Sequence, residues 1–144
     1  ATGKNNVVAK DAIVTGDIRT ISPEQLQRTQ KTMTEIVAKH LPKTNATISF
    51  DEGYPPFAPT EGNYELLKQL SKVSTDLGFM AVEPVNPSNA GAADISFTSP
   101  YIEMGLDGLG MGGKNDHTVN ETGDLKVLPM QTKRAAVLLY RLTR

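Results

Sequence analysis

The sequence predicts an α/β fold in two parts. Helical patterns alternate with short extended segments, in the order strand–helix–strand and then helix–strand–loop–strand–loop–helix. Between the two parts, residues 53–59 hold three prolines within five positions, which fix φ repeatedly and make a stiff connection. A composition of 38% hydrophobic and 22% charged residues suits a globular chain. We therefore expect a first part at 1–55 and a second at 56–144.

Composition and charge exclude several classes of protein. The net charge of −1 and the lack of a long basic run argue against a nucleic-acid partner. The longest apolar run, 135–140, is far too short to span a bilayer. Without cysteine there are no disulfides and no thiolate metal sites, and no signal peptide is visible at Ala1. We expect a soluble protein, and its compartment stays open.

The first part is predicted to be strand–helix–strand. Residues 6–20 are rich in apolar and β-branched positions, and residues 45–50 alternate as a strand does. Asp17 and Arg19, two apart, would share one face of the first strand. The simplest interpretation of this pair is a solvent-exposed salt bridge.

A helix is predicted between these strands. Ser22 is its N-cap, Pro23 occupies the first helical position, and Gln25 can close a capping box. Pro42 should end the helix, which places His40 in the last turn as a surface residue. The apolar stripe comprises Leu26, Met33, Ile36, Val37 and Leu41.

The second part is bounded by two predicted helices. The first covers about 63–77 and ends at Gly78, and the last covers 125–142. Short strands are expected at 79–85 and 104–109. The buried side of the first helix would comprise Leu66, Leu67, Leu70, Val73 and Leu77, and that of the last Ala135, Ala136, Leu139 and Leu142.

A glycine-rich stretch, 106–121, carries one histidine, His117. Such a loop can place an imidazole where a ligand needs it, but an ordinary loop histidine fits the pattern equally well. A metal site needs three or four ligands. Asp94, Asp116 and Glu121 are candidates, yet their spacing matches no self-contained site. No nucleotide-binding motif is present, since no Lys-Ser/Thr follows the glycines.

Several segments, in order, resemble one family. They are Asn6-Val-Val through Gly16-Asp-Ile-Arg-Thr, then Gly53-Tyr-Pro-Pro-Phe, Gly91-Ala-Ala-Asp-Ile, Asp107-Gly-Leu-Gly and His117-Thr-Val-Asn-Glu. Together they are similar to the C-terminal part of the di-zinc metallopeptidases that include glutamate carboxypeptidase, carboxypeptidase G and acetylornithine deacetylase.

The resemblance implies an architecture and an activity. Residues 1–55 would be the second half of a two-layer lid that also makes a homodimer. Residues 56–144 would be the C-terminal portion of a three-layer α/β catalytic domain. The complete enzyme would bind two zinc ions and hydrolyse an amide bond next to a free carboxylate, in a peptide or an N-acyl amino acid.

The same resemblance implies roles for four residues. His117 would be the last zinc ligand, Asn6 and Arg19 would grip the substrate carboxylate and polarise the scissile carbonyl, and Ala92 would offer its backbone. Tyr54 departs from the folate-cleaving members, which have arginine there.

The family's other metal ligands and its catalytic glutamate lie in a segment that this sequence lacks. The chain would therefore be a fragment or one piece of an enzyme, inactive alone, with no catalytic residue of its own and no zinc bound. The alternative is a metal-free binding or dimerisation module. In it, Asn6 and Arg19 would serve an interface and His117 would be an ordinary loop residue.

Overall fold

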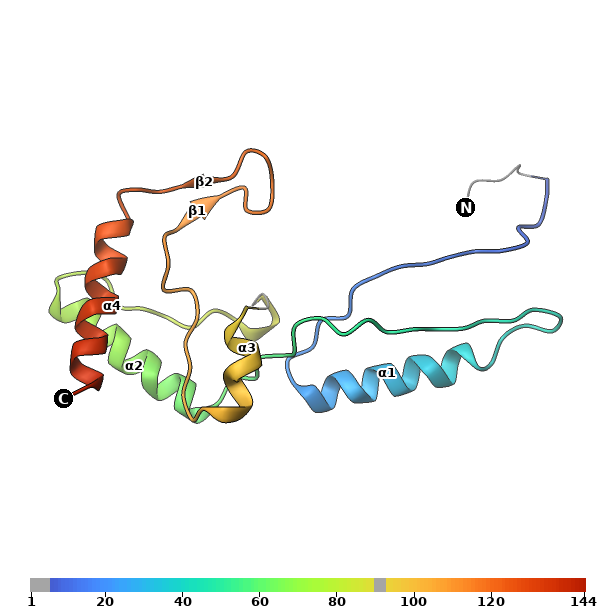
Figure 1. Cartoon of the computed structure of the whole chain (residues 1–144), viewed down its shortest axis with the longest axis horizontal. Coiled ribbons are helices and arrows are strands. Elements are labelled where there is room, and N and C mark those ends of the chain that lie inside the picture. The colour runs from blue at the N-terminus through green and yellow to red at the C-terminus, as the bar shows by residue number, and fades with distance from the viewer. Residues whose placement is uncertain (1–5, 90–92) are drawn as a thin grey trace.

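The computed structural model describes residues 6–89 and 93–144. Within these ranges the fold combines four α-helices with one small antiparallel sheet, so helix and strand do mix as expected. Figure 1 shows α1 and its flanking extended segments at one end of the molecule, and α2 and α4 at the other. The elements are α1 (Pro23–Val37), α2 (Glu61–Asp76), α3 (Ile95–Thr98), β1 (Gly113–Lys114), β2 (Thr122–Gly123) and α4 (Leu128–Leu142), with 3₁₀ turns at Pro87–Asn89 and Ser99–Tyr101. None of these helices is long and apolar enough to cross a membrane.

The start of α1 follows the predicted capping chemistry. The Ser22 side chain accepts a hydrogen bond from the Gln25 N–H at 3.2 Å. In return the Gln25 Oε1 accepts from the backbone of Ile21, at 2.9 Å, one residue earlier than a standard capping box would have it. The first bond gives a partner to the Gln25 N–H, one of the donors that the first turn of a helix leaves unpaired. The second gives a partner to the Ile21 N–H, just before the cap.

The predicted end of α1 is wrong by one turn. The helix stops at Val37, and His40 lies beyond it as an exposed residue with its Nδ1 3.1 Å from the Leu41 carbonyl oxygen. The Lys39 N–H donates to the Ile36 carbonyl at 3.0 Å, three residues back, so the helix closes with a tighter turn before Pro42 is reached.

The four predicted strands, 6–20, 45–50, 79–85 and 104–109, are also wrong. None of them forms a ladder with another described segment, and Gly108, within 104–109, has a φ of 76°, which interrupts extended geometry there. A strand needs a neighbour, and the first segment leaves Val8 93% and Val14 94% exposed. The strand–helix–strand lid therefore does not form as a sheet within the described residues.

The core lies between α2 and α4. Leu70 and Val73 of α2 are buried, and Leu138 of α4 is buried against them. The predicted stripe of α2 is thus confirmed, and Gly78 follows the helix with a φ of 79°, a conformation that favours glycine. Around this core pack the partly buried Leu66, Leu67, Leu77, Val82, Leu106, Leu109 and Val137.

Polar side chains of the helices take the place of strand neighbours along 79–82. The Ser71 hydroxyl accepts from the Val82 N–H at 2.9 Å, and the fully buried Ser74 donates to the Met80 carbonyl. Arg134 of α4 donates to Ser74 Oγ at 2.9 Å and to the same Met80 carbonyl at 3.2 Å. The Met80 carbonyl and the Val82 N–H are therefore bonded without a sheet.

Helix side chains also bond the backbone of the 105–110 segment. Asn63 of α2 accepts from the Gly105 N–H at 2.9 Å, and Gln131 of α4 donates to the Gly110 carbonyl at 2.9 Å. Asn63 also donates to the Ala58 carbonyl at 3.3 Å, so one amide joins three parts of the chain.

The predicted buried side of α4 is wrong for Ala136, Leu139 and Leu142, which are exposed, whereas Ala135 is half-buried. Leu139 is 62% exposed and Leu142 46% exposed, whereas Leu138, Val137 and Arg134 face α2 and the 79–82 segment. Arg134 occupies the inward side because its guanidinium also bonds Gln131 and lies over the Phe79 ring, 5.7 Å from its centroid. Apolar Leu139 is left on the outer side, beside Ala135 and Ala136.

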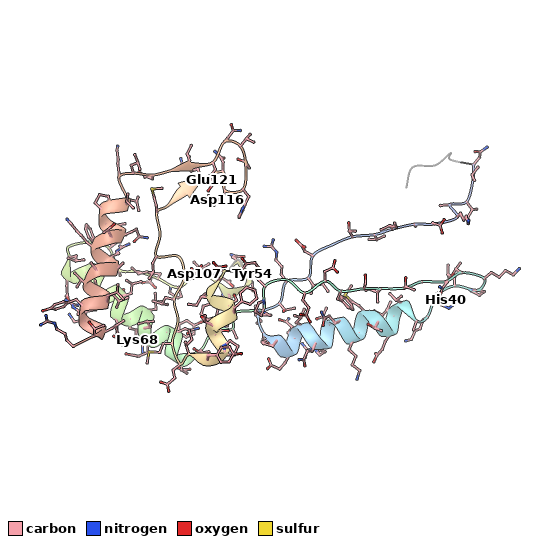
Figure 2. The ribbon with its side chains drawn as sticks, in the orientation of Figure 1. His40, Tyr54, Lys68, Asp107, Asp116 and Glu121 are labelled. Atoms are coloured by element: carbon pink, nitrogen blue, oxygen red, sulfur yellow. The ribbon has the colours of Figure 1, made fainter. Side chains whose placement is uncertain are left out.

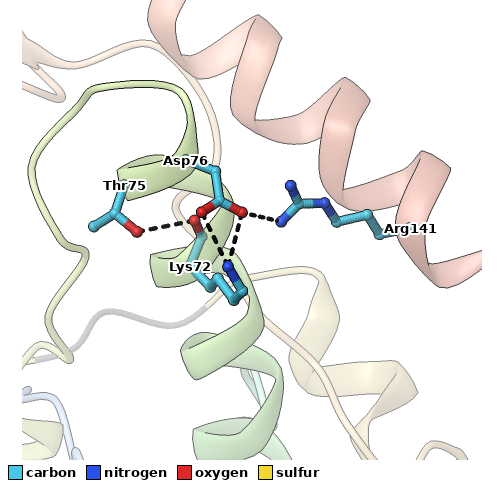
Figure 3. Close-up of polar contacts among 4 residues, drawn as sticks. All are labelled: Lys72, Thr75, Asp76 and Arg141. Atoms are coloured by element: carbon cyan, nitrogen blue, oxygen red, sulfur yellow. Dashed lines mark hydrogen bonds and ion pairs between the residues drawn. The ribbon is translucent and has the colours of Figure 1, made fainter.

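A surface ion pair adds to the contact between α2 and α4 (Figure 3). Asp76 is 3.0 Å from the Lys72 ammonium on its own helix and 2.8 Å from the Arg141 guanidinium on α4. Hydrogen bonds from Lys72 and Arg141 lower the pKa of the Asp76 carboxyl below its usual value. The carboxylate therefore stays ionised into mildly acidic solution, and the pair persists there.

We expect Arg134→Met to lower the free energy of unfolding by about 2 kcal/mol. The substitution keeps the apolar stem but removes charged donors from the buried Ser74 hydroxyl and the Met80 carbonyl. Urea unfolding followed by circular dichroism measures the change. Lys133→Met, at an exposed neighbouring position of α4, is the control and should change stability by less than about 0.5 kcal/mol. Equal losses in both variants would contradict this account.

Candidate functional site

His117 lies in the loop that connects β1 to β2. Its φ of 63° and that of Asn115, 60°, are in the left-handed region, which histidine and asparagine tolerate better than most residues. The Asn115 carbonyl accepts from the Thr118 N–H at 3.2 Å and from the Thr118 hydroxyl at 2.7 Å. Glu121 N–H then donates to the Thr118 carbonyl at 3.1 Å. The loop is thus internally bonded, and His117 is exposed on it.

The candidate metal ligands do not come together. Figure 2 shows Asp116 and Glu121 on this same loop, well apart from Tyr54, whose hydroxyl bonds the third candidate, Asp94. Within 6–89 and 93–144, no group of three or more His, Asp or Glu side chains could hold a metal ion. Since a zinc site needs several ligands in fixed geometry, the described residues do not form one by themselves.

The predicted substrate residues are exposed and separate. Arg19 lies just before α1, whereas the segment that carries Asn6 lies at the end of the molecule farthest from α4 (Figure 1). The ion pairs of the described part involve Lys68, Lys72 and Arg141, so the simple Asp17–Arg19 salt bridge is not formed. Ala92 lies outside the described residues.

A cluster that the sequence did not predict joins two of the resembling segments. The Tyr54 hydroxyl donates to Asp94 Oδ1 at 2.9 Å, across 40 positions of sequence. The Tyr54 ring also lies against the Phe97 ring, with centroids 5.0 Å apart and planes inclined by 54°. This tilted contact is a favourable arrangement for two aromatic rings. We call Tyr54, Asp94 and Phe97 the aromatic–acidic cluster.

The Asp94 carboxylate changes how readily the Tyr54 phenol ionises. The hydrogen bond to Asp94 raises the pKa of Tyr54 above its usual value, and the negative charge of Asp94 raises that pKa further. Ionising the phenol would remove the donor and place two negative charges side by side. Tyr54 is therefore a donor that stays protonated at neutral pH and orients one carboxylate oxygen.

Sequence reasoning could reach parts of this cluster but not its assembly. Tyr54 stands out as a departure from the family pattern, and Asp94 as a candidate ligand. Their contact depends on how the 53–59 connection folds back onto α3, a long-range event that no local pattern encodes. Phe97 carries no signal beyond its hydrophobicity.

We expect Asp94→Asn to lower the pKa of Tyr54 towards 10.0, its ordinary value, because the negative charge that opposes ionisation is removed. Ultraviolet difference titration measures tyrosine ionisation, and subtraction of a Tyr54→Phe titration assigns the group among the four tyrosines. Glu83→Gln, an exposed carboxylate with no contact to the cluster, is the control. An unchanged Tyr54 titration in Asp94→Asn would show that the bond does not exist in solution.

Comparisons with protein-family models, with curated proteins and with solved structures give no match to this chain.

Proposed function

We propose that the chain supplies part of a zinc-dependent carboxypeptidase or deacylase that hydrolyses an amide bond next to a free carboxylate. The observation that supports this best is the loop of His117, which is bonded internally and presents one exposed imidazole. An imidazole held in this way costs little further ordering when it becomes a metal ligand. Arg19 supports the proposal as well, since it is exposed and pairs with no described carboxylate.

The proposal requires more protein than the described residues. One imidazole binds zinc poorly, and the remaining ligands and the catalytic base would have to come from protein outside this sequence. In such a site zinc would supply a Lewis acid and an activated water. This chain would hold the metal through His117 and the substrate carboxylate through Arg19, with Asn6 and the Ala92 backbone as further contacts.

The test uses the complete protein in which this sequence occurs. His117→Ala should remove about one of two zinc ions and abolish hydrolysis of N-acyl amino acids, with the circular dichroism spectrum unchanged. His40→Ala, the other exposed histidine, is the matched control and should keep both metal and activity. Full activity in His117→Ala would refute the metal role.

A second pair of variants addresses substrate binding. Arg19→Ala should raise KM for a carboxylate substrate by about tenfold or more, because a charged two-point contact is lost. Its effect on stability should stay within about 0.5 kcal/mol, as for an ordinary surface site. Arg28→Ala, on the exposed side of α1, is the control. Loss of folding with normal activity per folded molecule would favour a structural Arg19.

The alternative function is a metal-free interaction module, and the surface of the chain favours it. A folded monomer of 15.6 kDa exposes about 7,200 Å² by the usual scaling, whereas this chain exposes 12160 Å². The excess is about 5,000 Å², as much as a large obligate interface covers. We therefore propose association for both functions, with a homodimer as the simplest form.

We expect the isolated chain to self-associate through its apolar extended segments. Val14→Lys should weaken that association, because Val14 is 94% exposed on the 6–20 segment. Val119→Lys, at an equally exposed valine of the hairpin loop, is the control. Sedimentation velocity over a range of concentrations measures the oligomer. A monomer at every concentration would contradict the expectation.

A further inference from the structure

The middle of the sequence is strongly acidic. Residues 44–113 contain nine carboxylates against only Lys68 and Lys72, while the stretches on either side each carry three more basic than acidic residues. From 73 to 113 there is no lysine, arginine or histidine at all. The aromatic–acidic cluster is built entirely from this acidic middle. The part of the chain that supplies the cluster therefore carries a net negative charge, which favours a cationic ligand over an anionic one.

The cluster presents two aromatic rings and one carboxylate to solvent. Tyr54 is 51% exposed and Phe97 is 53% exposed, and Asp94 is exposed beside them. The Tyr54 hydroxyl bonds one oxygen of Asp94, and no described residue bonds the other. The carboxylate is thus oriented by a neutral donor and keeps its negative charge and one accepting oxygen.

Two other aromatic rings of the chain already carry a cation. Arg134 lies over Phe79, 5.7 Å from the ring centroid, and Arg144 lies over Tyr140 at 4.1 Å. Within the described residues no lysine or arginine is paired with Asp94 or placed over the Tyr54 and Phe97 rings. The Tyr54 and Phe97 rings differ from the other described rings without a cation in that a carboxylate, Asp94, is hydrogen-bonded beside them.

We propose that Tyr54, Asp94 and Phe97 form a binding site for an organic cation, an ammonium or guanidinium group such as ends a lysine or arginine side chain. The ring faces attract the cation through their quadrupoles, and Asp94 adds a charge-assisted hydrogen bond. A divalent metal ion is the poorer ligand, since a single carboxylate leaves most of its coordination positions to water.

This site is independent of the zinc function. The Tyr54 and Asp94 segments are two of those on which the resemblance to the zinc enzymes rests. If the chain has the proposed zinc function, a cation bound at the cluster would make the enzyme prefer substrates with a basic group. That second step rests on the proposed function, whereas binding of the cation does not.

The test titrates the chain itself with N-acetyl-arginine amide and follows aromatic and backbone signals by NMR. N-acetyl-citrulline amide, which has nearly the same shape without the charge, is the matched probe. We expect the arginine probe to shift signals of Tyr54, Asp94 and Phe97 and to bind about fivefold more tightly than the citrulline probe.

Variants then separate the contributions of the three groups. Asp94→Asn should weaken binding of the arginine probe about fivefold, and Phe97→Leu should weaken it by a smaller factor. Tyr54→Phe keeps the ring and removes the bond that orients Asp94, so it should reduce affinity less than Asp94→Asn. Glu83→Gln, an exposed carboxylate of the same acidic stretch, should leave affinity unchanged.

Two outcomes would overturn the proposal. One is equal binding of the arginine and citrulline probes, and the other is unchanged affinity for arginine in Asp94→Asn. Because neither measurement uses zinc or turnover, a negative result here says nothing against His117, and an inactive enzyme says nothing against the cation site.

Discussion

The fold depends on how two extended segments satisfy their backbone hydrogen-bonding groups. Neither the 79–82 segment nor the 105–110 segment pairs with a strand, so helix side chains must bond them. Ser74 and Arg134 provide the central contact, since one buried hydroxyl and one guanidinium together bond the Met80 carbonyl and join α2 to α4. This contact lies beside the apolar core of Leu70, Val73 and Leu138, and it stabilises that core because the buried Ser74 hydroxyl would otherwise lack its charged donor.

Local signals predicted the presence of α1, α2 and α4 but not the strands. The Ser22 cap, the stripe of α2 and the glycine after it are all read within a few residues of sequence, and all are present. A strand is defined by a partner that can lie anywhere in the chain, so β-rich composition alone cannot place it. The buried face of α4 failed for a related reason. The apolar pattern of α4 predicts a charged residue such as Arg134 on the outer side. Arg134 instead faces inward and bonds Ser74 and Met80.

The candidate site was predicted unevenly. The position of His117 in a distinctive loop was visible from glycine spacing, but its left-handed backbone was not. Asn6 and Arg19 are exposed, and neither makes a side-chain hydrogen bond or ion pair with another described residue that would fix its place in a site. The aromatic–acidic cluster arises only through tertiary contact. Polar residues inside an apolar stripe, such as Ser74, are the one sequence feature that could have pointed to the bonding of the 79–82 segment.

The absence of any buried residue in α1 bears on how the protein unfolds. The helix is maintained by its cap and by local hydrogen bonds, and none of its residues packs against the core of Leu70, Val73 and Leu138. Local opening of α1 therefore costs much less than global unfolding of α2 and α4. We therefore expect the two regions to open separately, in which case a single melting temperature does not describe the chain. A partner that packs against α1 would merge the two units into one transition.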